Sequence, residues 1–196
     1  MLKSAGKGRE IRLETETIRV ENGTDVILVL LHAKSGRQDG KEGIIGNTRL
    51  DKMIFLLEKE TAFAKYLKDF SYEPYNFGPY SSEVFDAIQA LRSAGLVKLT
   101  PSSSDQFLEE ADRYQIERQL ADGDSPGPKS TITYSLTAEG EEVASSLFLS
   151  LTKEERDELQ KFKLQFNNMS LQELIRYVYK KYPEYTTESK IRNQFI

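Results

Sequence analysis

The chain lacks the residues on which most catalytic and metal sites depend. It has no cysteine and one histidine, His32, among 196 residues. Without cysteine there are no disulfides and no thiolate metal ligands, which fits a reducing, cytoplasmic compartment. Any nucleophile with a histidine base would have to use His32, which lies in the apolar stretch VILVLLHAK, away from any nucleophile motif. A histidine in such a stretch is usually a packed structural residue.

Long apolar runs and phosphate-binding loops are also missing. The longest apolar run is VILVLL at residues 26–31, whereas a membrane span needs roughly 18 to 20 apolar residues. No apolar segment follows the first basic residues, so no secretory signal is expected. Neither a Walker loop nor G-x-G-x-x-G occurs, and the 31 acidic residues are scattered among 27 basic ones. We therefore predict that the protein is not an enzyme, needs no cofactor or metal, and does not enter a membrane.

Helical periodicity and capping residues predict a mostly helical chain. An almost wholly apolar helix is expected over about 25–34, capped by Thr24 or Asp25, and it should be central. A glycine-rich loop follows, and then a second helix capped by Asn47 or Thr48. The apolar positions of this second helix follow the one-face spacing i, i+3, i+4, i+7: Leu50, Met53, Ile54 and Leu57.

A third helix and two strands complete the central pattern. The third helix is predicted over 82–94, begins at Ser81 or Ser82 and ends at Gly95. Its buried stripe contains Val84, Phe85, Ile88 and Leu91. The strands LVKLT and STITYSLT follow, and then the helix EEVASSLFLSL.

Two further helices begin with capping-box pairs near the end of the sequence. The pairs are Thr152 with Glu155, and Ser170 with Glu173. Pro183 ends the second of these helices because proline cannot continue it.

This order of helices and strands is that of a winged helix. We predict a mostly α (α+β) fold: a winged helix-turn-helix with a two-stranded wing and extra C-terminal helices. Residues 1–22 form an N-terminal arm or edge strand, with a partly disordered tail as the equal alternative. Residues 23–150 form the winged-helix domain, with an acidic insert at 101–130, and residues 151–196 form C-terminal helices packed on it. Because flanking helices commonly join such proteins in pairs, we expect a homodimer.

Two sets of motifs resemble known families. GLVKL and ITYSLTAEGEEVA resemble the helix–wing–helix passage of the MarR and PadR winged-helix regulators. More closely, GNTRLDKMIFLLEKE, YNFGPYSSEVFDAIQALRSAGLV and LQELIRYVYKKYPEYTTES resemble the YwgA-type proteins and the related SocA-like Panacea antitoxin domain, although Asp51 stands where that group usually has Gln. The resemblance implies a winged-helix fold and a bacterial, archaeal or phage regulatory or defence-linked protein. Antitoxins and proteolytic adaptors occur in that group.

The helix at 82–94 takes the place of a DNA recognition helix, so double-stranded DNA is the first candidate partner. Lysine and arginine supply the phosphate contacts of such proteins, and side chains of the recognition helix contact bases. The candidate nucleic-acid-binding residues come from the second helix, the third helix and a basic arm: Arg49, Lys52, Ser82, Gln89, Arg92, Lys3, Lys7 and Arg9. The alternative for Arg49 and Lys52 is an ordinary solvated surface.

Acidic residues weigh against DNA. Glu83 and Asp86 lie on the first two turns of the third helix, where they would repel phosphate. The insert at 101–130 has seven acidic and three basic residues, a difference of −4 that equals the formal net charge of the chain.

The segment SYEPYNFGPY suggests a protein partner instead. Pro74 and Pro79 hold the residues before them extended, so we expect an ordered connection and not a helix. Tyrosine-rich surface suits protein binding, which makes four aromatic residues candidate partner contacts: Tyr72, Tyr75, Phe77 and Tyr80. The alternative is that they pack the connection against the core. DNA binding is thus the leading hypothesis, and an antitoxin- or adaptor-like module that grips a protein such as a toxin is the second.

Overall fold

The computed structural model describes residues 18–36, 42–102 and 131–195. Along these residues the chain is mostly helical with two small antiparallel sheets, which confirms the α+β class. The helices are α1 (Gly23–His32), α2 (Asn47–Glu60), α3 (Ser82–Ser93), α5 (Ala138–Ser150), α6 (Lys153–Asn167), α7 (Leu171–Lys181) and α8 (Arg192–Phe195), with 3-10 turns η1 (Ala62–Tyr66) and η2 (Pro183–Thr186). The strands are β1 (Ile44–Ile45), β2 (Glu73–Tyr75), β3 (Gly78–Tyr80), β4 (Val97–Ser102) and β5 (Thr131–Leu136).

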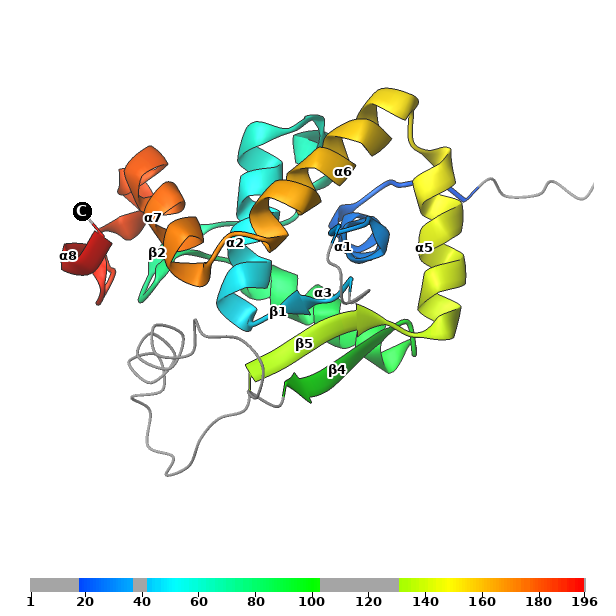
Figure 1. Cartoon of the computed structure of the whole chain (residues 1–196), viewed down its shortest axis with the longest axis horizontal. Coiled ribbons are helices and arrows are strands. Elements are labelled where there is room, and N and C mark those ends of the chain that lie inside the picture. Colours follow the sequence, from blue (N-terminus) through cyan, green and yellow to red (C-terminus); the bar gives the residue numbers. More distant parts are fainter. Residues whose placement is uncertain (1–17, 37–41, 103–130, 196) are drawn as a thin grey trace, which may run out of the picture.

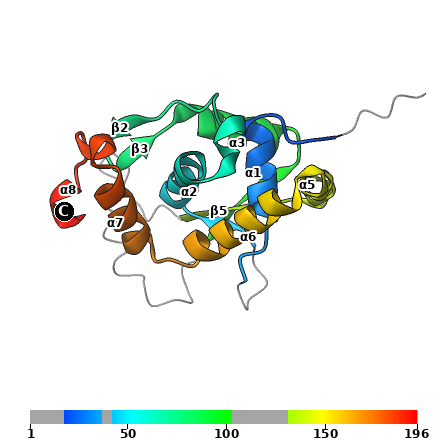
Figure 2. The ribbon, with the colours of Figure 1, turned by 90° about the horizontal axis from the view of Figure 1, so that it is seen from above.

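Helix α1 is the centre of the fold, as its apolar composition predicted. Six consecutive residues, 26–31, are at most 2% exposed, because a helix that is apolar on every side must be covered on every side. Figure 1 looks nearly along α1 and shows α5, α6 and the larger sheet arranged around it. Helix α3 also contacts α1. Figure 2, seen from above, shows α7 and α8 at the end of the molecule opposite α5.

The larger sheet has the strand order β1-β5-β4. Strands β4 and β5 pair antiparallel from Val97↔Leu136 to Ser102↔Thr131, and Ile44 of β1 pairs with Tyr134 of β5. Because side chains alternate along a strand, Tyr134 faces the core and is 2% exposed. The smaller sheet is the separate β2–β3 hairpin.

Local sequence signals predicted the starts of some helices correctly and those of others wrongly. The capping boxes Thr152–Glu155 and Ser170–Glu173 are present and begin α6 and α7. The predicted caps of the first two helices are wrong, because α1 is capped by Asn22 and α2 follows Gly46, whose φ of 93° favours glycine. The segment SYEPYNFGPY is extended as predicted, but it forms the β2–β3 hairpin, which the sequence had not indicated.

Several predictions concern residues outside the described ranges. They are the arm with Lys3, Lys7 and Arg9, and nearly all of the acidic insert at 101–130. In the part of the chain that the structure does describe, no helix is long and apolar enough to cross a membrane.

Lysine and arginine side chains donate to the carbonyls at the C-terminal ends of two helices in this fold. Lys163 of α6 is fully buried, and its Nζ donates to the carbonyl of Leu31, 2.7 Å away, at the end of α1. Arg156 donates in the same way to the carbonyls of Leu149 and Leu151 at the end of α5. The last carbonyls of a helix have no partner inside the helix, so an external cation satisfies both their hydrogen bonding and the helix dipole.

We predict that Gly140→Ala destabilises the protein because the backbone of Leu96 fills the space. A Cβ on Gly140 would lie 1.9 Å from the Leu96 carbonyl oxygen, which already accepts from Thr137 N–H at 3.0 Å. Urea unfolding should show a loss of about 3 kcal/mol. Gly95→Ala is the control, since Gly95 has a φ of +74° but open space around it; its cost should be about 1 kcal/mol. Equal losses at the two positions would contradict the steric argument.

We also predict that stability rises with pH above neutrality because of Lys163. Burial lowers the pKa of Lys163 from 10.5 to about 7, with the positive charge of Lys34 acting in the same direction and Glu42 opposing it. Between pH 7 and pH 9 the unfolded chain therefore carries a proton on Lys163 that the folded chain has released. The free energy of unfolding should increase by on the order of 2 kcal/mol over this range.

Urea unfolding at a series of pH values tests this prediction. Lys163→Met should remove most of the increase, whereas Lys161→Met, on the exposed face of the same helix, should leave it unchanged. An equal slope in wild type and Lys163→Met would refute the assignment.

Candidate functional site

Arg49 does not lie on an exposed helix face, contrary to the sequence-based expectation. It is 7% exposed, and its Nη1 donates to the carbonyls of Phe166, at 3.0 Å, and Met169, at 2.7 Å. The Phe166 carbonyl lies in the last turn of α6, where a helix leaves acceptors unsatisfied, and Met169 follows the end of the helix. The guanidinium therefore joins α2 to α6 and is not presented to a phosphate backbone.

Lys52 is also buried, and this corrects the same expectation. It is 2% exposed, like its neighbour Asp51, and its Nζ lies 2.9 Å from Asp51 Oδ2. The ammonium also donates to the carbonyl of Pro79 in β3. A buried ammonium needs such partners because burial removes its hydration. Lys52 thus fastens the β2–β3 hairpin to α2.

The hairpin is held from its other side by the C-terminal part of the chain. The carbonyl of Asn76, in the turn, accepts from Lys190 N–H at 3.0 Å, and Ser189 Oγ lies 2.6 Å from the Tyr179 hydroxyl. Gly78 follows with a φ of +90°, and a Cβ there would lie 2.9 Å from a ring carbon of Tyr179. Only glycine suits this position, because both the backbone conformation and the close approach exclude a side chain.

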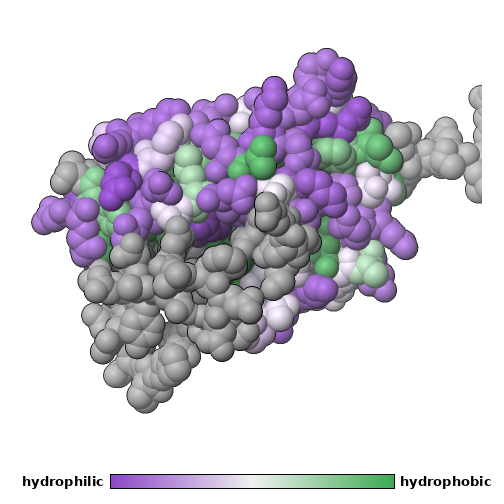
Figure 3. All heavy atoms as spheres, viewed as in Figure 1, coloured by the Kyte–Doolittle hydropathy of each residue, from purple (hydrophilic) through white to green (hydrophobic). Residues whose placement is uncertain are grey.

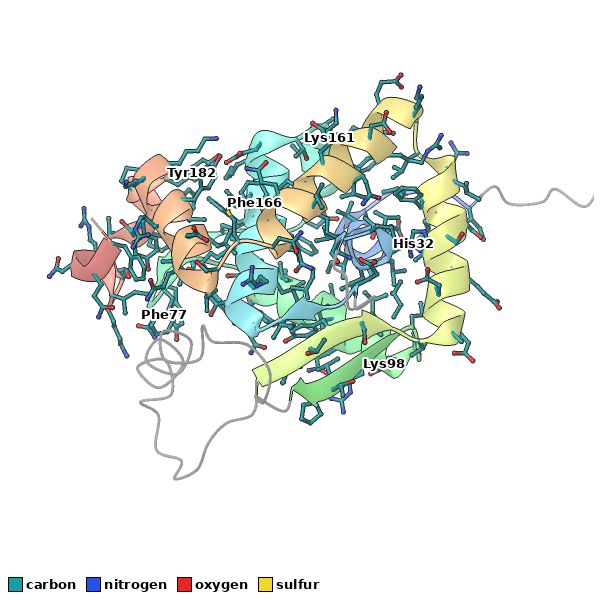
Figure 4. All side chains as sticks on the ribbon, in the orientation of Figure 1. His32, Phe77, Lys98, Lys161, Phe166 and Tyr182 are labelled. Atoms are coloured by element: carbon teal, nitrogen blue, oxygen red, sulfur yellow. The ribbon has the colours of Figure 1, made fainter. Side chains whose placement is uncertain are left out.

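A pocket of about 280 Å³ opens between α2, the hairpin and α3. Its lining residues come from all three elements and are Asn47, Thr48, Asp51, Lys52, Tyr75, Phe77, Gly78, Tyr80 and Phe85. Figure 4 places Phe77 at the end of the molecule near α7 and α8, far from His32. The volume is at the lower end of the range for small-molecule sites and suits one large side chain.

Aromatic rings form a continuous wall of this pocket. The ring centroids of Tyr75 and Tyr80 are 5.0 Å apart, and those of Tyr80 and Phe85 are 5.7 Å apart with planes inclined by only 19°. Tyr75 is 47% exposed. Tyr72 differs from the other predicted partner contacts, because its ring packs edge-on against Phe55 and its hydroxyl is buried. The pocket therefore brings together Tyr75, Phe77 and Tyr80, but not Tyr72.

Carboxylates dominate the electrostatics around the pocket. Burial raises the pKa of Asp51, against the charge of Lys52 and the backbone N–H of Ser81, which lower it. One oxygen of this carboxylate, Oδ1, is buried and accepts no hydrogen bond from the described residues. Burial and the charges of Asp51, Glu83 and Asp86 all raise the pKa of Tyr80, so three acidic groups lie around the aromatic wall.

The exposed face of α3 carries the remaining candidate DNA contacts. Ser82, Gln89 and Arg92 are exposed, as predicted, and Asp86 is exposed on the same helix. Glu83 accepts from the hydroxyls of Ser81 and Ser82, and hydrogen bonding keeps the pKa of its carboxyl low. This face of α3 therefore carries one arginine and two carboxylates.

His32 and the metal-ligating residue types form no second site in the described ranges. His32 Nδ1 lies 2.8 Å from Glu141 Oε1, and its ring packs against Phe148. No group of three or more histidine or acidic residues there is arranged to hold a metal ion.

Sequence reasoning missed five lining residues of the pocket: Asn47, Thr48, Asp51, Gly78 and Phe85. One available signal was the run MIFLL at 53–57, which is apolar on every side of α2. Such a helix is surrounded by other elements, so Asp51, one turn earlier, is buried too, whereas Asn47 at the start of the helix is exposed. Asn47 had been interpreted as a cap, but its Oδ1 accepts from the Tyr134 hydroxyl at 2.6 Å.

Comparison with known proteins gives one match. A family model described as antitoxin SocA-like, Panacea domain, matches residues 50–183. This confirms the resemblance drawn from the sequence motifs. The matched range includes the β2–β3 hairpin, α3 and α7, which form or support the pocket. Searches among curated proteins and among solved structures find no match.

We predict that Lys52→Met destabilises the protein strongly because it leaves Asp51 buried without its cation. Removal of one partner of a buried ion pair costs about 3 to 5 kcal/mol, measurable by urea unfolding. The double variant Asp51→Asn/Lys52→Met should be at least about 1 kcal/mol more stable than Lys52→Met alone. Lys68→Met, at an exposed position, is the matched control and should change little. A double variant less stable than Lys52→Met would contradict the pairing.

Proposed function

Because the chain belongs to the family of antitoxin SocA-like proteins with a Panacea domain, we propose that it is a non-catalytic module that binds and neutralises a toxin protein. The contact surface is the pocket between α2, the β2–β3 hairpin and α3. The exposed ring of Tyr75 forms the side of the pocket that faces the partner, and Phe77 and Tyr80 line the pocket behind it.

One observation carries this proposal: an aromatic pocket beside a largely acidic helix face. On the face of the molecule shown in Figure 3, hydrophilic residues predominate and hydrophobic ones form small separate groups. Aromatic residues are enriched where proteins bind one another, and tyrosine contributes large contact area at low entropic cost. Tyr75, which is 47% exposed, is the one aromatic residue among the exposed large hydrophobic residues in the described part of the chain.

The winged-helix interpretation supports the choice of surface. The element order and the sheet order β1-β5-β4 agree with a winged helix in which α3 takes the recognition position. DNA binding by α3 is the alternative function, with Ser82, Gln89 and Arg92 as contacts. The burial of Arg49 and Lys52 weakens it, because these two cations are committed to backbone carbonyls. A shared fold does not determine which partner a surface binds.

We predict that the toxin cross-links to the pocket. With the photoreactive residue p-benzoylphenylalanine in place of Tyr75, illumination of cells that encode the chain should give one major protein adduct, identified by mass spectrometry. The matched control is the same residue at Leu149, which is 70% exposed on α5, at the opposite end of the molecule from β2 (Figure 1). The adduct protein alone should arrest growth, and co-expression of the chain should restore it.

Two variants connect the rescue of growth to the pocket. Tyr75→Ala should lower the affinity for the toxin by about 30-fold and abolish rescue, whereas Tyr75→Phe should retain both. Binding to random duplex DNA, measured by fluorescence anisotropy at about 50 mM and 200 mM salt, should be absent. Salt-sensitive DNA binding without any toxic adduct would refute the proposal and favour the alternative.

A further inference from the structure

The pocket has an acidic floor with an unused acceptor. Asp51 lines the pocket and is 2% exposed. Lys52 Nζ lies 2.9 Å from its Oδ2, and the backbone N–H of Ser81 also lowers the pKa of this carboxyl, but Oδ1 is buried with no hydrogen-bond partner among the described residues. A buried carboxylate oxygen without a donor is unfavourable, since burial has removed its water. A ligand that brings an N–H to this oxygen would relieve that cost.

The charges around the pocket select a cation. Besides Asp51, the carboxylates of Glu83 and Asp86 lie close enough to raise the pKa of Tyr80. Lys52, the one cation among the described residues that line the pocket, already donates to Asp51 and to the carbonyl of Pro79. A phosphate or a carboxylate would therefore meet acidic oxygens, and a purely apolar side chain would leave Asp51 Oδ1 unsatisfied.

The aromatic wall selects among cations. Tyr80 and Phe85 are stacked at 5.7 Å with planes 19° apart, and Tyr75 lies 5.0 Å from Tyr80. Aromatic faces attract cations. A guanidinium is planar, stacks on such faces, is weakly hydrated and offers five donors, whereas an ammonium is compact and strongly hydrated.

We propose that the pocket binds an arginine side chain of the protein partner. This inference rests on the proposed function and specifies the chemistry of its contact. The guanidinium lies against the rings of Tyr75 and Tyr80 and donates to Asp51 Oδ1. The toxin should accordingly present an exposed arginine at its contact surface.

A blocked tripeptide, acetyl-Gly-Arg-Gly-amide, tests the pocket without the toxin. Titrated into the isotopically labelled full chain, it should shift the backbone amide resonances of Thr48 and Gly78 with a dissociation constant on the order of 1 mM. The same peptide with citrulline, which has a similar shape but no charge, should bind about tenfold more weakly. A lysine peptide should bind about threefold more weakly than the arginine peptide.

Variants at the rim and at the floor separate the two contacts. Tyr75→Ala should lower the affinity for the arginine peptide about fivefold. Tyr75→Phe should keep that affinity within about twofold of the wild-type value, because the ring face is retained. Both changes are at a largely exposed side chain and leave the fold intact. The double variant Asp51→Asn/Lys52→Met, which leaves neither member of the buried pair without its partner, should reduce the preference for arginine over citrulline to about twofold or less. Glu142→Gln, at an exposed position on α5, should have no effect and excludes general attraction to acidic surface.

Three outcomes would overturn the inference: equal affinity for arginine and citrulline peptides, shifts confined to residues outside the pocket, or unchanged binding by Tyr75→Ala. The experiments distinguish failure of the arginine contact from failure of the proposed antitoxin function. Growth rescue that needs Tyr75, without arginine binding, would refute only the arginine contact. Arginine binding without a neutralised toxin would refute only the antitoxin role.

Discussion

Buried lysine and arginine side chains that donate to backbone carbonyls hold this fold together. Arg49, Lys52 and Lys163 are each at most 7% exposed, and each donates to a carbonyl on a segment far away in the sequence. Carbonyls at a helix end or in a tight connection have no partner of their own when the core covers them. A lysine or arginine that reaches them from another helix satisfies them and is itself satisfied. The packing of α1, α2, α6 and the β2–β3 hairpin depends on these contacts.

The same constraint shapes the pocket between α2, the β2–β3 hairpin and α3. Because Lys52 donates to Asp51 and to the carbonyl of Pro79, the β2–β3 hairpin packs against α2 with its aromatic side chains toward α3. Lys52 pairs with only one of the two carboxylate oxygens of Asp51. The other oxygen, Oδ1, remains available as an acceptor at the floor of the pocket. A structural contact thus supplies both the position of the aromatic wall and the chemistry beneath it.

Local signals in the sequence predicted what depends on local interactions. The apolar helix α1, the alternation of Ile132, Tyr134 and Leu136 in β5, and the capping boxes of α6 and α7 are all determined within a few neighbouring residues. The partners of Arg49 and Lys52 are not. Arg49 bonds to Phe166, 117 residues away, and Lys52 bonds to Pro79, 27 residues away. The run MIFLL at 53–57 indicates that this part of α2 is covered, but no local pattern identifies the distant carbonyls that these cations bind, and both were assigned to DNA.

Helix α3, which the winged-helix hypothesis places where many such proteins read DNA, does not present the chemistry of a DNA-reading surface. A DNA-reading face needs free cations near the recognition helix. Around α3, two of the candidate cations are bonded inside the protein, and Glu83 and Asp86 accompany Arg92. The adjacent pocket offers ring faces and carboxylate oxygens, which complement a cationic side chain. The distribution of charge between the interior and the surface, more than the order of helices and strands, is therefore what favours a protein over a nucleic acid as the partner.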